Sequence, residues 1–303
     1  MNADSGARPA GSRYRSIYRP GLFDGQLIVV TGAGSGIGRC TAHELAQLGA
    51  TIAMIGRKRD KLEAVQAEIA ANGGRASLYT CDIRDEAAVD QAFKAIVADH
   101  GRLDALVNNA GGQYSAPLEA LSLKGWDSVV RNNLHGGFLC MQAALRLHMR
   151  DHGGAIVNMV ADMWNGMPGM AHSGAARAGM LNLTETAASE WGQYGIRVNA
   201  VAPGWIGSSG FDTYDDETKA MIRTLPPKVP LQRFGTESEI AAAIVFLLSE
   251  GAAFITGTCI RIDGGVPNAK HNWPLQPMTH PSPACQAFDG FHLASRPRVL
   301  DGL

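Results

Sequence analysis

A short apolar strand that runs into a glycine-rich turn and then a helix constrains this chain more than any other feature. Residues 27–31 form an apolar, mostly β-branched run, four glycines fall within residues 32–38, and helical spacing begins at Arg39. Glycine lets the backbone approach a ligand closely, and the first turn of a helix presents N–H groups and the positive end of its dipole. This order of strand, turn and helix predicts an anion-binding loop suited to the phosphates of a nucleotide.

The same alternation of strand and helix continues along the chain. Apolar runs predict seven strands, at residues 27–31, 51–55, 76–81, 105–107, 155–160, 197–201 and 258–262. Helical spacing predicts helices at residues 39–48, 60–71, 86–99, 128–150, 173–193 and 238–248. Strands that alternate with helices pair in parallel, because each crossover returns the chain to the same end of the sheet. We therefore expect an α/β protein of the Rossmann type, with a doubly wound, seven-stranded parallel sheet and helices on both faces.

A single domain accounts for this alternating pattern, which leaves no room for a linker between residues 25 and 265. We expect residues 25–265 to form the nucleotide-binding domain and residues 1–24 to form an N-terminal arm. From residue 266 the pattern stops and prolines recur, which predicts an extended C-terminal tail over residues 266–303.

Composition excludes several classes of partner. With 27 basic and 28 acidic residues the net charge is −1, so we expect neither nucleic acid nor a membrane as a partner. No apolar run is long enough to span a bilayer. The five cysteines are scattered and lack the spacing of a metal site, so we expect no metal. Reduced thiols of this kind indicate a cytoplasmic protein.

The end of the second predicted strand indicates which dinucleotide binds. A protein that prefers NAD usually carries an acidic residue here, whose carboxylate accepts from a ribose hydroxyl. This chain has Arg57 and Lys58 instead, and Arg39 follows the glycine turn. Guanidinium and ammonium groups suit a 2′-phosphate, which predicts NADP(H) as the cofactor. The alternative is that these side chains are ordinary solvated charges.

Motifs at several separated places resemble the short-chain dehydrogenase/reductase family over about residues 25–265. They are Thr31-Gly32-Ala33-Gly34-Ser35-Gly36-Ile37-Gly38, Cys81-Asp82-Ile83, Asn108-Asn109-Ala110-Gly111 and Pro203-Gly204. Besides Arg57 and Lys58, the resemblance implies that the cofactor contacts Thr31, Gly32, Ser35, Gly36, Ile37, Gly38, Asp82, Ile83, Asn109, Ala110, Gly111, Arg177, Pro203, Gly204 and Ile206. Asp82 and Ile83 would flank the adenine, and residues 201–204 together with Ile206 would lie along the nicotinamide. Asn133 matches the family's catalytic-site asparagine.

The chain departs from the family at the residues that usually carry the chemistry. Most members hold a tyrosine and, four residues later, a lysine, and a serine precedes them near the end of the fifth strand. Here Ser173 and Arg177 stand at the first two positions, and residues 158–162 contain no serine. A serine hydroxyl is a poor acid and an arginine stays charged, so this pair does not shuttle a proton. Both groups suit the stabilisation of negative charge that develops on an oxygen.

Enoyl-CoA and dienoyl-CoA reductases of the short-chain type share this departure. The chain resembles the peroxisomal trans-2-enoyl-CoA reductases of that group at residues 20–22, 111–113, 124–126, 172–179, 182–184 and 272–274. The resemblance implies NADPH-dependent reduction of the α,β double bond of an enoyl thioester. We therefore expect an acyl-CoA-type small molecule as the substrate.

This chemistry gives each candidate catalytic residue a role. Hydride addition to the β-carbon of the substrate leaves negative charge on the thioester oxygen. We expect Ser173 to donate to that oxygen, Arg177 to anchor the ribose and support the charge, and Asn133 to orient the site. Asp162 follows the fifth strand, where ligands meet open α/β sheets, and is a candidate proton donor to the α-carbon. A loop aspartate or a helix cap is an equal alternative for Asp162.

Two other functions stay open at this point. One is an NADP-dependent carbonyl reductase or alcohol dehydrogenase of the same fold, and the other is a nucleotide-binding subunit without catalysis. Family analogy implies a homo-oligomer, either a tetramer or a dimer. Next to the candidate site, we expect His172 to pack, because adjacent helix residues point about 100° apart. We expect Tyr114 to line a wall or the surface.

Overall fold

Seven parallel strands form a single sheet in the computed structural model, which describes residues 18–269 and 274–284. The strands are β1 (Leu27–Thr31), β2 (Thr51–Gly56), β3 (Arg75–Thr80), β4 (Ala105–Asn108), β5 (Gly154–Met159), β6 (Ile196–Pro203) and β7 (Cys259–Ile262). Their order across the sheet is β3-β2-β1-β4-β5-β6-β7, and every neighbouring pair is parallel. The predicted Rossmann-type sheet is confirmed.

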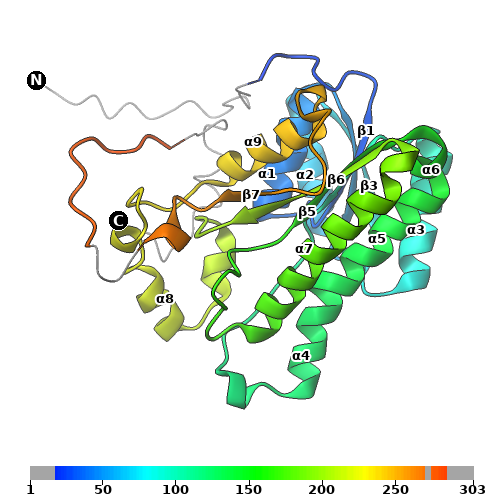
Figure 1. Ribbon diagram of the computed structural model, residues 1–303. Coiled ribbons are helices and arrows are strands. Elements are labelled where there is room, and N and C mark those ends of the chain that lie inside the picture. The colour runs from blue at the N-terminus through cyan, green and yellow to red at the C-terminus, as the bar shows by residue number, and fades with distance from the viewer. Residues whose placement is uncertain (1–17, 270–273, 285–303) are drawn as a thin grey trace, which may run out of the picture.

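Helices cover both faces of the sheet, as predicted (Figure 1). On one face lie α1 (Gly36–Gln47), α2 (Arg59–Ala71) and α9 (Glu237–Leu248). On the other lie α3 (Glu86–His100), α5 (Gly136–Ala144) and α7 (Ala171–Trp191). α1 begins at Gly36 instead of the predicted Arg39 and α7 at Ala171 instead of Ser173, and α2 and α9 each begin one residue earlier than predicted. Within the described ranges, no helix combines the length and the apolar character needed to cross a membrane.

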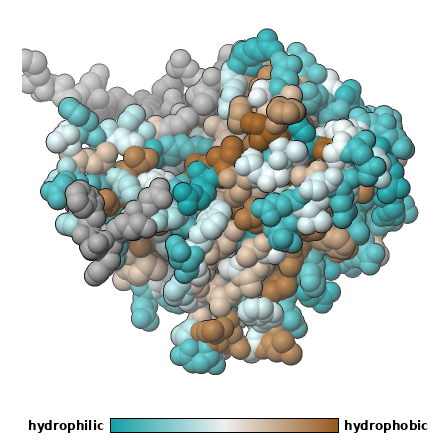
Figure 2. Space-filling view, viewed as in Figure 1, coloured by the Kyte–Doolittle hydropathy of each residue, from teal (hydrophilic) through white to brown (hydrophobic). Residues whose placement is uncertain are grey.

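A long helical segment between β4 and β5 contains two π-helical stretches. It runs through α4 (Leu123–Val130), η2 (Arg131–His135), α5, η3 (Leu145–Met149) and α6 (Arg150–His152), and η2 and η3 are π-helical. It starts earlier than the predicted residue 128 because Ser122 caps it, accepting from the Gly125 N–H at 3.1 Å. Figure 2 shows brown, hydrophobic surface at the lower end of the molecule, in the region where Figure 1 labels α4. Leu118, which precedes α4, and Leu123, its first residue, are 67% and 76% exposed.

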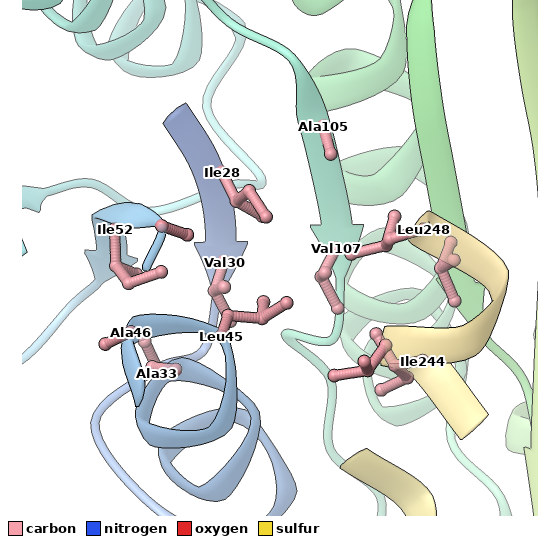
Figure 3. Close-up of a cluster of buried hydrophobic side chains, with 14 of the residues drawn as sticks. Ile28, Val30, Ala33, Leu45, Ala46, Ile52, Ala105, Val107, Ile244 and Leu248 are labelled. Carbon is pink, nitrogen blue, oxygen red and sulfur yellow. The ribbon is translucent and has the colours of Figure 1, made fainter. Parts of the chain in front are cut away.

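Buried apolar side chains hold the helices against the sheet. On the face of α1 and α9, Ile28 and Val30 of β1 pack with Leu45 of α1 and Ile244 of α9 (Figure 3). All five residues of β1 are buried, as expected of a central strand covered on both sides. Each large apolar side chain that is fully buried stabilises the fold by about 1.5–3 kcal/mol. The central strands therefore form a rigid base for the loops at their carboxyl ends.

The connection from β6 to α9 contains structure that we did not predict from the sequence. Its elements are η5 (Ser209–Thr213), α8 (Asp216–Ile222) and η6 (Pro226–Lys228). α8 begins after Asp215, whose carboxylate accepts from the Thr218 N–H at 2.7 Å. A small buried cluster of Phe211, Ile222 and Leu225 packs beneath it. Elements this short do not repeat an apolar period often enough to be recognised in a sequence.

The arm before β1 is described from residue 18. Its Tyr18 hydroxyl donates to the Ala242 carbonyl oxygen of α9 at 2.7 Å, and Phe23 is buried in the core. Residues 18–24 therefore pack against the domain. Predictions for residues 1–17 lie outside the described residues.

The C-terminal tail differs from the prediction at its start. Instead of extended chain, it begins with one 3-10 turn, η8 (Val266–Asn268), which follows Gly265 with a φ of +86°. Residues 274–284 contain no helix or strand, and Arg233 donates to the carbonyl oxygens of Ser282 and Pro283 at 3.1 Å and 3.3 Å. Predictions for residues 270–273 and 285–303 fall outside the described part of the chain.

Candidate active site

The loops that hold the predicted site residues meet along one edge of the sheet. β1 ends at Thr31, β4 at Asn108, β5 at Met159 and β6 at Pro203. β1 and β4 are neighbours although they are not consecutive, so the order of strands reverses direction between them. Ligands of open α/β sheets bind in the crevice outside such a reversal. The fold therefore brings the glycine turn, the loop after β4 and the segments after β5 and β6 to one place.

Close packing requires glycine at two positions of the turn after β1. A Cβ on Gly32 would lie 2.9 Å from the backbone of the loop after β4, and a Cβ on Gly38 would overlap the Asn109 side chain. At Gly36, by contrast, a Cβ would meet no atom nearer than 3.7 Å. Ser35 precedes α1 without capping it through its side chain, and the first turn of α1 has no acidic residue. An uncapped helix N-terminus beside unfilled space fits the pyrophosphate of a dinucleotide.

Thr31 joins the ends of β1 and β4 through its side chain. The hydroxyl oxygen accepts from the N–H groups of Asn109 and Ala110 at 3.1 Å and 3.0 Å, and the hydroxyl donates to the Val107 carbonyl oxygen at 3.3 Å. The Asn109 amide donates to the Thr31 carbonyl oxygen at 3.0 Å. Thr31 is completely buried. Its hydroxyl therefore fixes the loop that forms one wall of the site, a role that the sequence analysis did not foresee.

Arg57 and Lys58 lie side by side and exposed at the end of β2. Arg39, the third cation considered for a 2′-phosphate, is held elsewhere: its guanidinium donates to both carboxylate oxygens of Glu68, at 2.9 Å and 2.5 Å. Burial by itself would raise the pKa of Glu68, but hydrogen bonds from His43 and Arg39 lower it overall. Glu68 thus stays charged and retains Arg39. Of the three cations considered for a 2′-phosphate, Arg57 and Lys58 are therefore the two that remain exposed.

Asp82 and Ile83 follow β3 on the side predicted for the adenine. The Asp82 carboxylate accepts from Nε and Nη2 of Arg84 at 2.9 Å and 2.6 Å. These hydrogen bonds lower the pKa of Asp82. Ile83 is nearly buried against α5, where a Cβ on Gly136 would lie 2.5 Å from its Cδ1. The ion pair with Arg84 fixes the carboxylate and was not expected from the sequence.

Asn133 clamps the loop after β4 from the π-helical segment η2. Its Oδ1 accepts from the Gly112 N–H at 3.0 Å, and its Nδ2 donates to the Gly112 carbonyl oxygen at 2.8 Å. A Cβ on Gly111 would lie 2.6 Å from Asn133 Oδ1 and 2.5 Å from Nη2 of Arg177. Glycine at position 111 therefore lets the loop approach Asn133 and Arg177 closely. Without a side chain at this position, a space bounded by backbone remains beside the guanidinium, and we call it the cradle at Gly111.

Arg177 is a buried cation on α7. It is 9% exposed, its Nη1 donates to the Met159 carbonyl oxygen at 2.6 Å, and its Nε is buried without a hydrogen-bond partner. Burial lowers the pKa of Arg177 to about 10, and no carboxylate of the described residues offsets this effect. A buried charge without a partner costs stability. The orphaned Nε and the cradle at Gly111 fit an electron-rich group such as the ribose of a nicotinamide nucleotide.

Ser173 is completely buried one turn before Arg177, and its hydroxyl is already engaged. It donates to Oε1 of Gln113 at 2.5 Å, and Nε2 of Gln113 donates to the Tyr214 hydroxyl oxygen at 3.3 Å. The donor that the sequence analysis assigned to a substrate oxygen is thus occupied by another side chain. Gln113 belongs to the stretch 111–113 that carries the family resemblance, but the contacts of Gln113 with Ser173 and Tyr214 were not predicted, because they join loops distant in sequence.

His172 and Tyr114 form a wall next to Ser173. Their rings pack edge to face with centroids 4.7 Å apart, and His172 is fully buried, which agrees with the packing role expected for it. The Tyr114 hydroxyl lies toward α4, since a Cβ on Gly125 would overlap it. Tyr214 reaches Ser173 only through Gln113. Neither tyrosine therefore donates directly to Ser173 or takes its place.

Asp162 follows β5 and has an acidic neighbour, Asp263, that follows β7. Each of the two side chains has one buried carboxylate oxygen without a hydrogen bond. Burial raises the pKa of Asp162, the negative charge of Asp263 raises it further, and Arg261 opposes both effects. Arg261 stacks over Trp164 at 5.5 Å from the ring centre, with its Nε 3.8 Å from Asp263 Oδ2. These surroundings favour the protonated form of Asp162. Asp263 was missed because nothing in its sequence context points to Asp162.

The segment after β6 lies between Asp263 and the loop before α9. A Cβ on Gly204 would lie 2.7 Å from the Asp263 Cα, so glycine is required for this close approach. Ile206 is 7% exposed and lines a cavity of about 150 Å³ together with Trp205 and Leu231. Of the residues predicted to lie along the nicotinamide, Ile206 thus borders a cavity whose wall also contains the charged side chains of Arg233 and Glu239.

Comparison with known proteins assigns these features to a family of enzymes. The chain matches the family model described as enoyl-(acyl carrier protein) reductase over residues 32–267. It is 44% identical over 243 residues to a probable 2,4-dienoyl-CoA reductase of Bacillus subtilis that produces (2E)-enoyl-CoA, covering 78% of this chain and 95% of that protein. It is 40% identical over 240 residues to a 3-oxoacyl-(acyl-carrier-protein) reductase of Staphylococcus aureus, covering 78% and 96%.

Solved structures agree with the sequence comparison. The citronellol catabolism dehydrogenase of Pseudomonas aeruginosa is 56% identical, with a TM-score of 0.76, and the match covers 84% of this chain and 99% of that one. A short-chain dehydrogenase of Bacillus anthracis is 39% identical, with a TM-score of 0.71 and coverage of 82% and 98%. Both matches cover nearly the whole length of the solved structures and more than four fifths of this chain.

Proposed function

Since this chain belongs to the short-chain dehydrogenase/reductase family, whose members are oxidoreductases that use a nicotinamide cofactor, we propose that it reduces the α,β double bond of a trans-2-enoyl-CoA with NADPH. The observation that carries the proposal is the pair Ser173 and Arg177 on α7, a buried hydroxyl and a buried, uncompensated guanidinium. The relative named as a dienoyl-CoA reductase supports the same chemistry.

The chain's residues hold the cofactor at three places in this proposal. The turn Gly32–Gly38 and the N-terminus of α1 receive the pyrophosphate, and Arg57 and Lys58 bind the 2′-phosphate. Arg177 and the cradle at Gly111 receive the ribose next to the nicotinamide. When bound, the cofactor supplies a hydride to the β-carbon of the substrate.

Ser173 and Arg177 stabilise the negative charge that reaches the thioester oxygen. Residues four apart on a helix share a face, so Ser173 donates to the thioester oxygen while the positive charge of Arg177, which binds the ribose, supports it from one turn away. The low polarity around them strengthens their interaction with that charge, and their positions are fixed before the reaction begins. Donors of this kind typically contribute about 100- to 1,000-fold to a rate. A strong acid is not required at this oxygen, which explains why a serine suffices.

Asp162 supplies the proton to the α-carbon in the same proposal. A proton donor must be protonated at the pH of the reaction, and burial together with Asp263 raises the pKa of Asp162 in that direction. Asn133 acts as a positioning residue, because its two hydrogen bonds to Gly112 hold the loop that faces Arg177.

A substrate panel tests the proposal. NADPH oxidation is followed with trans-2-enoyl-CoA and 2,4-dienoyl-CoA esters of several lengths, with a 3-oxoacyl thioester and with simple aldehydes. A methyl-branched enoyl-CoA joins the panel because citronellol, which the Pseudomonas aeruginosa relative helps to degrade, is branched. We expect turnover of enoyl thioesters. Rates for carbonyl substrates should be lower by a factor of about 100 or more, because no general acid serves the carbonyl oxygen.

Reduction of 3-oxoacyl thioesters is the second candidate, and the relative from Staphylococcus aureus favours it. This reaction places an alkoxide where Ser173 is the nearest donor, and a serine does not release its proton readily. Faster turnover of the 3-oxoacyl thioester than of any enoyl thioester would replace the first proposal with this one. Binding of NADPH without turnover of any substrate would favour a nucleotide-binding subunit.

We also propose that the protein forms a homodimer or homotetramer. Leu123 and Phe254 are 76% and 104% exposed, which is costly for large apolar side chains on an isolated surface. Light scattering during size-exclusion chromatography measures the mass directly. A purely monomeric mass at micromolar concentration would exclude this part of the proposal.

A further inference from the structure

Three polar side chains from three separate elements form a chain of hydrogen bonds that ends at the reaction site. Ser173 lies on α7, Gln113 in the loop after β4, and Tyr214 in the connection after η5. The Ser173 hydroxyl donates to Gln113 Oε1 at 2.5 Å, and Gln113 Nε2 donates to the Tyr214 oxygen at 3.3 Å. Every donor in this chain points outward, from the buried serine toward the surface.

This direction conflicts with the role of Ser173. A hydroxyl has a single proton to donate, and here Gln113 receives it. The Ser173 hydroxyl therefore cannot donate to a substrate oxygen while it donates to Gln113. Ser173 is fully buried, whereas Gln113 is exposed, so the side chain with freedom to move is the glutamine.

A half-turn of the Gln113 carboxamide resolves the conflict. The terminal torsion of a glutamine is broad and nearly two-fold, and the turn exchanges oxygen and nitrogen with little change in shape. Nε2 then donates to Ser173 Oγ, Oε1 accepts from the Tyr214 hydroxyl, and the Ser173 proton is released toward the substrate. Hydrogen bonds that share one direction polarise and strengthen each other.

We propose that Gln113 and Tyr214 are positioning residues that turn the Ser173 hydroxyl toward the thioester oxygen when substrate binds. This inference rests on the proposed function, since it assumes that Ser173 donates to that oxygen. The backbone of Gln113 is well placed for the task, because Asn133 fixes the adjacent Gly112 through two hydrogen bonds of 3.0 Å and 2.8 Å. The amide thus rotates on an anchored loop.

Substitutions that remove one link at a time test the proposal. Gln113→Leu removes both the donor and the acceptor, and we expect kcat for the substrate of the wild-type protein to fall about 10-fold, with the KM for NADPH unchanged. Tyr214→Phe removes one hydrogen bond, and we expect a fall of about 3-fold. The matched controls are Gln193→Leu, an exposed glutamine elsewhere, and Tyr79→Phe, whose hydroxyl donates to Asp99. Both controls should leave kcat unchanged.

The double variant distinguishes positioning from a general effect on structure. Because Tyr214 acts through Gln113, the double variant should equal Gln113→Leu alone, and Gln113→Leu should have no effect when Ser173 is already alanine. Gln113→Glu adds a pH readout. Its carboxylate only accepts, whereas its protonated form also donates, so kcat relative to the wild-type protein should recover as the pH falls.

Three outcomes would overturn the inference: an unchanged kcat in Gln113→Leu, losses that multiply in the double variant, or a relative kcat of Gln113→Glu that does not depend on pH. All variants are compared by thermal unfolding, so that a loss of folded protein is recognised. Failure of the proposed function looks different, since the wild-type protein itself would then not reduce enoyl thioesters. The same variants are in that case measured on the substrate that it does reduce.

Discussion

The two halves of the site differ in how their buried polar groups are satisfied. Around β1 and β4, Thr31 and Asn109 exchange hydrogen bonds with each other and with the neighbouring backbone, and the one exception among the described residues of these two strands is Asn108, whose Oδ1 is buried without a partner. Around β5 and β7, Asp162, Arg177 and Asp263 each keep a buried side-chain atom without a hydrogen-bond partner. An unsatisfied buried polar group costs about 1–3 kcal/mol, and charged groups cost more. The hydrogen bonds of the first half therefore stabilise the protein, whereas we expect bound ligands to complete the unsatisfied groups of the second half.

Arg177→Met gives the largest effect expected from this comparison. The variant removes the buried positive charge, so kcat/KM should fall about 1,000-fold. The free energy of unfolding should stay the same or rise by about 1 kcal/mol, because methionine fills a similar volume without a charge to desolvate. Steady-state kinetics and denaturant unfolding measure the two effects. A variant that is less stable yet fully active would reverse the comparison.

Asp162→Asn tests the proton donor in the same half. We expect kcat to fall about 100-fold, because the amide holds no acidic proton. Unchanged turnover would remove Asp162 from the mechanism.

Asp263→Asn sharpens this test through the pH dependence. Activity that needs protonated Asp162 falls as the pH rises through the pKa of Asp162. Removal of the neighbouring negative charge lowers that pKa, so the basic limb of the kcat profile should move to lower pH. A basic limb that stays in place or moves to higher pH contradicts the proposed pairing.

Thr31→Val tests the satisfied half. Valine keeps the shape but loses the hydroxyl that bonds Asn109, Ala110 and Val107. We expect a loss of about 2 kcal/mol in the free energy of unfolding, measured with urea. Thr80→Val is the matched control, because Thr80 is exposed at the end of β3. Equal stability of the two variants would mean that the wall does not depend on this hydroxyl.

Arg57→Ala gives the smallest effect. We expect the KM for NADPH to rise about 10-fold, which corresponds roughly to the free energy of one hydrogen bond to a charged group. The KM for NADH should stay nearly unchanged. The control is Arg59→Ala, a nearby exposed arginine whose guanidinium pairs with Glu63 at 2.8 Å. An equal rise for both cofactors would end the assignment of Arg57 to the 2′-phosphate.

The same difference between the two halves of the site explains which structural features can be predicted from the sequence. Strands and helices follow from apolar periodicity, and the turn Gly32–Gly38 is local, so the fold and the nucleotide half are recognisable without coordinates. The reacting half depends on contacts between remote segments. Gln113 meets Ser173 across 60 positions and Tyr214 across 101. Neither contact leaves a periodic or local pattern, and the raised pKa of Asp162 depends on Asp263 in the same way.

The π-helical segment η2 has a consequence for how this site tolerates insertion and deletion. A π turn is equivalent to one residue added to a regular α-helix. Deleting one residue of Arg131–His135 should therefore let the segment relax to an α-helix while α5 keeps its place against the sheet. Because the deletion removes only the extra residue of the widened turn, α4 should keep its orientation relative to α5. The helix would survive, but Asn133 lies within the widened turn, so the deletion should break the two hydrogen bonds by which this side chain holds Gly112.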